Sequence, residues 1–226
     1  MGAMTITRVL LVRHGATTAT EEGRFSGSSG AELSDEGRRQ AALLGQRLSP
    51  QNLTAIYSSP LSRAIDTARI VAGQCKLDLE VRDDLREISH GRWEGIKRED
   101  VEHQFPDEYQ AWEADPFTFA PAGGESGVSV LARALPAVRE IVTAHPGGRV
   151  LVVSHKATLR LILSSLLGFD PRGYRDRLDQ SPACLNVVDF RDPVRARLML
   201  FNDVSHYRDE PRPAGANLSR WWDPNK

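Results

Sequence analysis

Hydrophobic residues along the chain occur in short continuous runs, and these alternate with segments in which they recur every three or four positions. A continuous run of four to eight apolar residues is typical of a strand buried on both faces, whereas the three-to-four spacing is typical of an amphipathic helix. The runs predict strands over residues 9–12, 54–58 and 150–153, and an alternating segment predicts a shorter one over residues 77–81. Helical spacing predicts helices that begin at Ser34, at Pro60, before Val128 and at His155.

This alternation of strands and helices predicts an α/β fold in which a doubly wound, mainly parallel sheet lies between two layers of helices, a three-layer sandwich. Residues 185–190 and 196–201 alternate between apolar and polar positions and are joined by Arg191-Asp192-Pro193, which predicts a hairpin with one antiparallel edge strand. A length of 226 residues suits one domain, residues 1–226, with a polar tail from about residue 209 that contains Trp221 and Trp222.

Residues 95–124 form an acidic and aromatic segment that lies between the third predicted strand and the helix predicted to begin just before Val128. The aromatic side chains Trp112, Phe117 and Phe119 recur with weak helical spacing, which predicts short helices laid over another part of the molecule. We expect a lid-like insertion here, and a simple surface excursion is the alternative.

The composition of the chain indicates which kinds of binding partner to expect. The net charge is −1 and no long basic run occurs, which does not favour binding to nucleic acid or to a membrane surface. No apolar stretch approaches the 18 residues of a membrane span. Cys75 and Cys184 lie far apart without metal-binding spacing, and we expect buried thiols in a reducing cytoplasm. A small-molecule partner is therefore expected, and the oligomeric state stays open.

Polar residues follow several of the predicted strands directly. Arg13-His14-Gly15 follows the first strand, Arg63 lies in the helix after the second, and His155 follows the fourth. Because ligands bind beyond the carboxyl ends of strands in an open α/β sheet, we expect these side chains to share one rim. Arginine offers a planar fork of donors that matches phosphate oxygens. A histidine in this position could be a nucleophile, a base or a metal ligand.

Five blocks of sequence carry a family resemblance. They are Leu11-Val12-Arg13-His14-Gly15, the run from Ser58 through Pro60 and Arg63 to Ala68, Glu87 followed by Gly91-Arg92-Trp93-Glu94-Gly95, Gly123-Gly124-Glu125-Ser126, and Val153-Ser154-His155. In this order, over roughly residues 8–201, the chain resembles the histidine phosphatase superfamily, whose fold is phosphoglycerate-mutase-like. The sequence that follows Glu87 is closer to the phosphatase branch.

The resemblance implies a role for each of five catalytic residues. His14 would attack phosphorus and form a phosphohistidine, which divides a difficult step into two easier ones. Arg13, Arg63 and His155, the last as an imidazolium, would hold the phosphoryl oxygens in place of a metal ion. Glu87 would protonate the leaving oxygen and then help to activate water, with a pKa raised by neighbouring anions. No metal and no other cofactor is expected.

The resemblance also implies a phosphate pocket in the loop after the first strand. Thr17, Thr20, Ser26 and Gly27 would line it together with the catalytic residues, and Lys156 would lie beside it. For Lys156 two interpretations are open. Its ammonium either lies in solvent or contacts a second anionic group of the substrate.

Three positions depart from the usual pattern of the family, namely Ala16, Thr20 and Lys156, and they leave the substrate open among phosphoglycerates, sugar phosphates, nucleotides and phosphoproteins. We expect a metal-independent phosphomonoesterase that acts on a small phosphorylated metabolite. A cofactor-dependent phosphoglycerate mutase with the same phosphohistidine is the alternative, and a non-catalytic binding module on the same fold is a third.

The other histidines are assigned lesser roles. His90 is expected in a loop near the site, and His103 and His145 are expected in solvent. His206 belongs to a polar cluster, residues 202–206, that is either a structural loop or part of the rim of the site.

Overall fold

The computed structural model describes residues 5–18, 24–28, 30–73 and 77–208. Thr20, Cys75, Trp221 and Trp222, for which the sequence raised expectations, lie outside the described residues. Within these ranges, no helix is both long enough and apolar enough to cross a bilayer.

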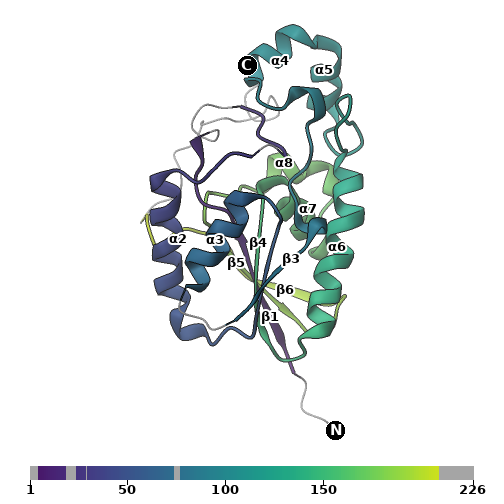
Figure 1. The fold of residues 1–226 in the computed structure, drawn as a ribbon. Coiled ribbons are helices and arrows are strands. Elements are labelled where there is room, and N and C mark those ends of the chain that lie inside the picture. Colours follow the sequence, from purple (N-terminus) through teal and green to yellow (C-terminus); the bar gives the residue numbers. More distant parts are fainter. Residues whose placement is uncertain (1–4, 19–23, 29, 74–76, 209–226) are drawn as a thin grey trace.

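A six-stranded sheet in the order β3-β2-β4-β1-β5-β6 forms the centre of the molecule (Figure 1). Its strands are β1 (Thr7–Arg13), β2 (Ala55–Ser58), β3 (Leu79–Val81), β4 (Arg149–Ser154), β5 (Leu185–Phe190) and β6 (Ala196–Asp203). The first four are mutually parallel, β5 is antiparallel to β1, and β6 is antiparallel to β5. The mainly parallel sheet is confirmed. Its antiparallel strand, β5, lies one position in from the edge, because its hairpin partner β6 occupies the edge itself.

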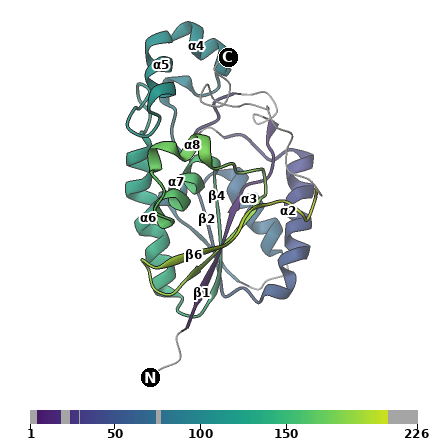
Figure 2. The ribbon, with the colours of Figure 1, turned by 180° about the vertical axis from the view of Figure 1, so that it is seen from behind.

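Helices cover both faces of the sheet, which confirms the three-layer sandwich. On one face lie α2 (Asp35–Leu48) and α3 (Ser62–Ala72), and on the other lie α6 (Gly127–Ala144) and α7 (Lys156–Leu166), as Figures 1 and 2 show. Shorter elements complete the fold: α4 (Arg98–Gln104), α5 (Pro106–Ala114), α8 (Tyr174–Arg177) and the 3₁₀ turns η1 (Ser49–Gln51), η2 (Asp83–Leu85), η3 (Gly91–Trp93) and η4 (Pro171–Gly173).

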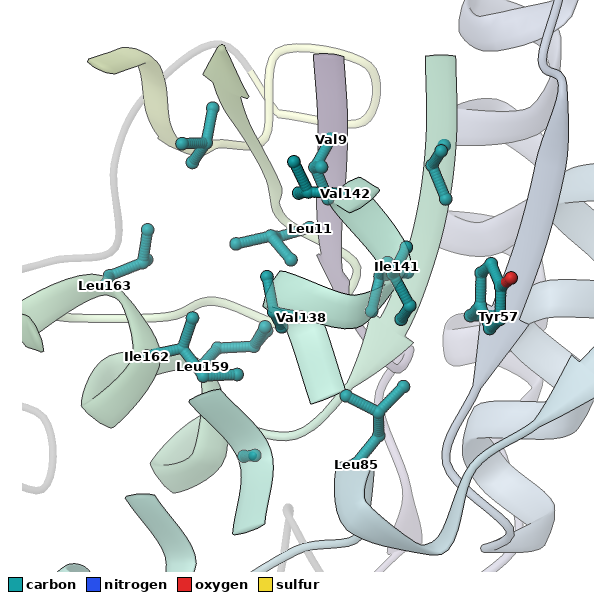
Figure 3. Close-up of a cluster of buried hydrophobic side chains, with 14 of the residues drawn as sticks. Val9, Leu11, Tyr57, Leu85, Val138, Ile141, Val142, Leu159, Ile162 and Leu163 are labelled. Atoms are coloured by element: carbon teal, nitrogen blue, oxygen red, sulfur yellow. The ribbon is translucent and has the colours of Figure 1, made fainter. Parts of the chain in front are cut away.

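The continuous apolar run in β1 reflects two cores, one on each side of the sheet. Val9 and Leu11 join the core beneath α6 and α7, where Figure 3 shows them facing Val138 of α6. Leu10 and Val12 join the core beneath α2 and α3. Because successive side chains of a strand point to opposite faces, a strand between two helix layers must be apolar at every position.

Helix ends follow the local signals. The side chain of Ser34 caps α2 by accepting a hydrogen bond from the Gly37 N–H, and Asn52, in the left-handed region, ends the turn that follows the helix. Pro60 was expected in the first turn of a helix. Instead α3 begins at Ser62 with Leu61 in extended conformation before it, so Pro60 precedes the helix.

The segment 95–124 contains α4 and α5 and lies beyond the carboxyl ends of the strands (Figure 1). It has a small core of its own, in which Trp93, Tyr109 and Trp112 are buried. Arg175 of α8 lies over the Trp112 ring, 4.7 Å from its centroid, and donates a hydrogen bond of 3.1 Å to the Glu113 carbonyl. The segment is therefore packed against α8, and the lid-like insertion stays a prediction.

Candidate active site

The register of the sheet brings two distant histidines together. Strands β1 and β4 are parallel neighbours with Arg13 opposite Ser154, so the next residues, His14 and His155, lie side by side. The His14 N–H donates to the Ser154 carbonyl at 3.0 Å, and the two imidazole centroids are 5.1 Å apart. Both side chains are buried, with 5% exposure for His14 and 0% for His155.

His14 is held in one protonation and tautomeric state. Its Nδ1 lies 2.7 Å from the Gly15 carbonyl oxygen, which can only accept a hydrogen bond, so Nδ1 carries the proton. Burial, with the nearby charges of Arg13 and Arg63, lowers the pKa of His14 well below its ordinary value. The ring is therefore neutral, and the lone pair on Nε2 is available for nucleophilic attack.

Gly15 is required for a close backbone approach. A Cβ at this position would lie 2.5 Å from the Gly37 carbonyl oxygen in the first turn of α2. The structure shows that the close neighbour is the α2 backbone, so Gly15 fixes the loop after β1 against that helix.

Two buried arginines lie beside the histidine pair. Arg13 is 6% exposed and donates from Nη1 to the Gln180 carbonyl at 2.7 Å, and Arg63 is 1% exposed and donates from Nη2 to the Gly27 carbonyl at 2.6 Å. These backbone carbonyl groups help to orient the two guanidinium groups. Burial lowers the pKa of Arg63, and the nearby Glu87 opposes that shift. The arrangement forms a positively charged, shielded site suited to an anion.

His155 was expected to be an imidazolium. Burial is the largest cause that lowers its pKa well below the ordinary value, and the charges of His14, Arg63 and Arg13 act in the same direction. These effects disfavour a positive charge on His155, and its imidazolium form stays a prediction.

The side chain of Glu87 lies against the first turn of α7, the helix that begins directly after His155. Its carboxyl oxygens accept hydrogen bonds from the N–H groups of Ala157 and Thr158, both at 3.2 Å, and from the Thr158 hydroxyl at 3.1 Å. Among the described residues, the hydrogen-bond partners of this carboxyl group are all donors, and the expected influence of neighbouring anions stays a prediction. These contacts orient Glu87, which is 8% exposed.

The residues expected to line the phosphate pocket differ in burial and in their contacts. Thr17 is buried and pairs with Leu33 in an isolated antiparallel β-bridge. Ser26 is half-buried. Gly27 is buried with φ +38° and contributes its carbonyl to Arg63. Thr20 lies outside the described residues.

Lys156 forms an ion pair. Its Nζ lies 3.6 Å from Asp179 Oδ1, and Nη2 of Arg160 donates to the same oxygen at 3.1 Å. Burial lowers the pKa of Arg160 to about 10. Sequence reasoning missed Arg160, although it lies one helical turn after Lys156 and so shares its face of the helix. Two cations thus share one carboxylate beside the histidine pair.

Glu94 is a second residue that sequence reasoning did not place. It accepts hydrogen bonds from the Ser28 N–H at 2.9 Å, the Ser89 hydroxyl at 3.1 Å and the His90 N–H at 3.1 Å. These contacts tie the loop that carries Gly27 to the loop that follows Glu87. The carboxylate of Glu94 thereby helps to hold the loop in which the Gly27 carbonyl accepts a hydrogen bond from Arg63.

The remaining histidines have structural contacts. His90 packs edge-on against Phe25, with centroids 4.8 Å apart, and burial lowers its pKa. His145 was expected in solvent but is half-buried, with its Nε2 2.9 Å from the Tyr57 hydroxyl. His206 packs edge-on against Tyr207, and burial lowers its pKa to about 4.

The cluster around His206 supports the loop that orients Arg13. The Asn202 side chain accepts a hydrogen bond from the Ser181 N–H at 2.7 Å, and the Tyr207 hydroxyl donates to the Pro182 carbonyl at 2.8 Å. The adjacent Gln180 carbonyl is the acceptor of Arg13 Nη1. Of the two interpretations of residues 202–206, these contacts favour the structural one.

The two neutral imidazoles of the site should make folding stability depend on pH. In the unfolded chain a histidine takes up a proton near pH 6.5, whereas the folded pKa values of His14 and His155 lie well below that. Between these limits the unfolded state binds more protons, so stability is complete above pH 6.5 and is lost as the pH falls below it. Each imidazole contributes a slope of up to about 1.4 kcal/mol per pH unit.

Urea unfolding between pH 7.5 and 5 measures this slope. His155→Gln should reduce it by up to about 1.4 kcal/mol per pH unit, whereas His103→Gln, at an exposed position of α4, should leave it unchanged. Equal slopes for the wild type and His155→Gln would mean that His155 is protonated in the folded protein.

A buried imidazole beside two buried arginines, with a carboxyl group nearby, is an arrangement suited to an enzyme that transfers phosphoryl groups. The sequence profile described as "Histidine phosphatase superfamily (branch 1)" matches residues 9–204, and the chain belongs to this family.

Curated relatives and solved structures agree with this membership. The chain is 37% identical over 163 residues to phosphoserine phosphatase 1 of Hydrogenobacter thermophilus, which covers 72% of this chain and 77% of the relative. A structure of Bacillus stearothermophilus YhfR superposes with a TM-score of 0.84 at 32% identity, covering 88% of this chain and 98% of that one. The native structure of mycobacterial glucosyl-3-phosphoglycerate phosphatase superposes with a TM-score of 0.79 at 30% identity, covering 87% and 99%. The protein is thus a phosphoric monoester hydrolase.

Proposed function

We propose that the protein hydrolyses phosphomonoesters of small metabolites through a phosphohistidine formed on Nε2 of His14, without a metal ion. The observation that carries the proposal is the 2.7 Å hydrogen bond from His14 Nδ1 to the Gly15 carbonyl, which leaves Nε2 unprotonated beside Arg13 and Arg63. A neutral imidazole held in this way is a nucleophile that is already oriented for attack.

In the first step Nε2 of His14 attacks phosphorus as the bond from phosphorus to the leaving oxygen breaks. Glu87 supplies the proton that the leaving oxygen takes up. In the second step water attacks the phosphohistidine, Glu87 accepts its proton, and the bond from phosphorus to Nε2 breaks to release inorganic phosphate. Arg13 and Arg63 stabilise the charge on the phosphoryl oxygens throughout, because their positions are set before the substrate binds.

Phosphate release from a panel of phosphomonoesters should persist when EDTA is present. Two buried guanidinium groups supply the positive charge that a divalent cation supplies in metal-dependent phosphatases, so the rate should change by less than about twofold. Released phosphate is measured before and after prolonged dialysis against the chelator. A large loss that one divalent ion restores would overturn the metal-free mechanism.

The same assay separates hydrolysis from the mutase alternative when the substrate is a phosphoglycerate and both products are followed. Release of phosphate should exceed formation of the isomeric phosphoglycerate. A mutase must keep water away from its phosphohistidine while the substrate reorients in the site. Dominant isomerisation would therefore favour the mutase.

We further propose that the substrate carries a second anionic group that Lys156 and Arg160 attract. Both cations lie in the first part of α7, directly after His155, and both contact the carboxylate of Asp179. The names of two similar proteins support this substrate class, since phosphoserine and glucosyl-3-phosphoglycerate each carry a carboxylate beside the phosphoester.

Lys156→Ala should raise KM for a phosphomonoester that has a second anionic group by about 5- to 150-fold, because an ammonium group beside the proposed phosphate site is removed. KM for a phosphomonoester with a neutral tail should stay nearly constant. Steady-state kinetics on the two substrates measure the difference. Matching changes for both would show that Lys156 does not recognise a second anion.

The segment 95–124 is proposed to act as a lid over this site. Support comes from its position beyond the carboxyl ends of the strands and from Phe25, which packs against Trp93 and Trp112 with ring centroids 5.4 and 5.5 Å away. Phe25 belongs to the loop that carries Ser26 and Gly27, so the lid is continuous with the expected phosphate pocket.

A cytoplasmic location belongs to the same proposal. Cys184 is a buried free thiol, and burial raises its pKa to about 12, which suits a protein kept in a reducing compartment.

A further inference from the structure

Ser59 lies next to His155 because of the register between β2 and β4. Ser58 pairs with Val153, and the Ser59 N–H donates to the Val153 carbonyl at 3.0 Å, so Ser59 immediately follows the paired strands. Its hydroxyl oxygen is 2.7 Å from Nε2 of His155. Both side chains are completely buried, so no water from the surface competes for this contact.

The other contact of the Ser59 hydroxyl indicates which partner donates. Its oxygen accepts a hydrogen bond from the Leu61 N–H at 3.3 Å, and the hydroxyl still has one proton to give. Nε2 of His155 is its acceptor among the described residues. A neutral imidazole that accepts at Nε2 carries its proton at Nδ1.

Nδ1 of His155 is buried and has no hydrogen-bond partner among the described residues. Leaving a buried N–H unpaired is costly, and the adjacent His14 ring is where the proposed mechanism puts the phosphoryl group. An N–H at Nδ1 could donate to a phosphoryl oxygen. The opposite tautomer would direct a lone pair at that oxygen and repel it.

We propose that Ser59 is a positioning residue that sets the tautomer of His155, so that Nδ1–H donates to the phosphoryl group transferred to His14. The inference rests on the proposed function for its acceptor, whereas the tautomer itself can be measured without turnover. Ser59 touches neither the substrate nor the reacting atoms, and it acts entirely through His155.

Ser59→Ala should lower kcat/KM by about 10- to 100-fold, the usual effect of removing the group that orients a catalytic imidazole. Ser59→Thr keeps the hydroxyl and should restore most of the activity. Ser58→Ala is the matched control, since Ser58 is equally buried but donates to the Ser59 carbonyl and does not touch His155. Ser58→Ala should keep wild-type kcat/KM.

A spectroscopic measurement distinguishes this role from a general loss of structure. With ¹⁵N-labelled histidine, and with the His155 signals assigned by comparison with His155→Gln, the wild type should show a protonated Nδ1 and an unprotonated Nε2. Ser59→Ala should show a mixture of tautomers in a protein that remains folded, as judged by circular dichroism. Added inorganic phosphate should shift the Nδ1–H proton of the wild type downfield.

Protonated Nε2 in the wild type would overturn the proposal, as would equal losses of activity in Ser59→Ala and Ser58→Ala. A failure of the proposed function is distinguishable, because the protein would then form no phosphohistidine on His14 while the tautomer of His155 could still depend on Ser59.

Discussion

His14→Ala is expected to abolish turnover, with kcat lower by at least about 10⁴-fold, because the variant lacks the atom that forms the covalent intermediate. The side chain contacts the Gly15 carbonyl and the site but belongs to neither hydrophobic core, so the fold should persist. Initial rates with a phosphomonoester measure the loss. Circular dichroism and binding of inorganic phosphate serve as controls for the fold and for the arginine pair.

Rapid acid-free quenching of the wild type with labelled substrate should trap the phosphoryl group on His14, and peptide mapping should place the label there. His14→Ala should take up none. Label on another residue, or turnover in His14→Ala within about tenfold of the wild type, would contradict a phosphohistidine at this position.

Glu87→Gln should slow hydrolysis of alkyl phosphates by about 10²- to 10⁴-fold and of an activated aryl phosphate by less than about tenfold. A poor leaving group needs a proton as it departs, whereas an activated aryl oxide does not. The N–H groups of Ala157 and Thr158 donate to different oxygens of Glu87, and the single amide oxygen of glutamine keeps one of these two hydrogen bonds. Circular dichroism of the variant therefore serves as the control for the fold. A series of leaving groups of graded pKa, assayed for both proteins, measures the dependence.

Glu94→Gln is the matched control. Its carboxylate accepts from the N–H groups of Ser28 and His90, which the amide oxygen of glutamine can also do. Equal losses for Glu87→Gln across the series would make Glu87 a structural residue. A leaving-group dependence that appears instead in Glu94→Gln would identify Glu94 as the acid.

Local pattern was enough to predict the fold class. The apolar run of β1 is continuous because Val9 and Leu11 face one core while Leu10 and Val12 face the other. A strand that is buried on both faces needs an apolar residue at every position, and this can be recognised from consecutive residues alone. The same reasoning put His14 and His155 beyond the ends of parallel strands, where an α/β sheet binds its ligands. These inferences succeeded because each depends on residues close together in the chain.

What the sequence determined by itself was the sandwich, the rim of the sheet and the residue types gathered there. What only the tertiary structure decided was the partner of each polar atom. Ser59 and His155 are 96 positions apart and meet through the register of β2 with β4. His145 reaches the Tyr57 hydroxyl from 88 positions away. Such contacts arise where strands pair and helices pack. The periodic pattern of a sequence indicates which face of an element is buried, but it does not indicate which polar atom of a distant residue will be the hydrogen-bond partner.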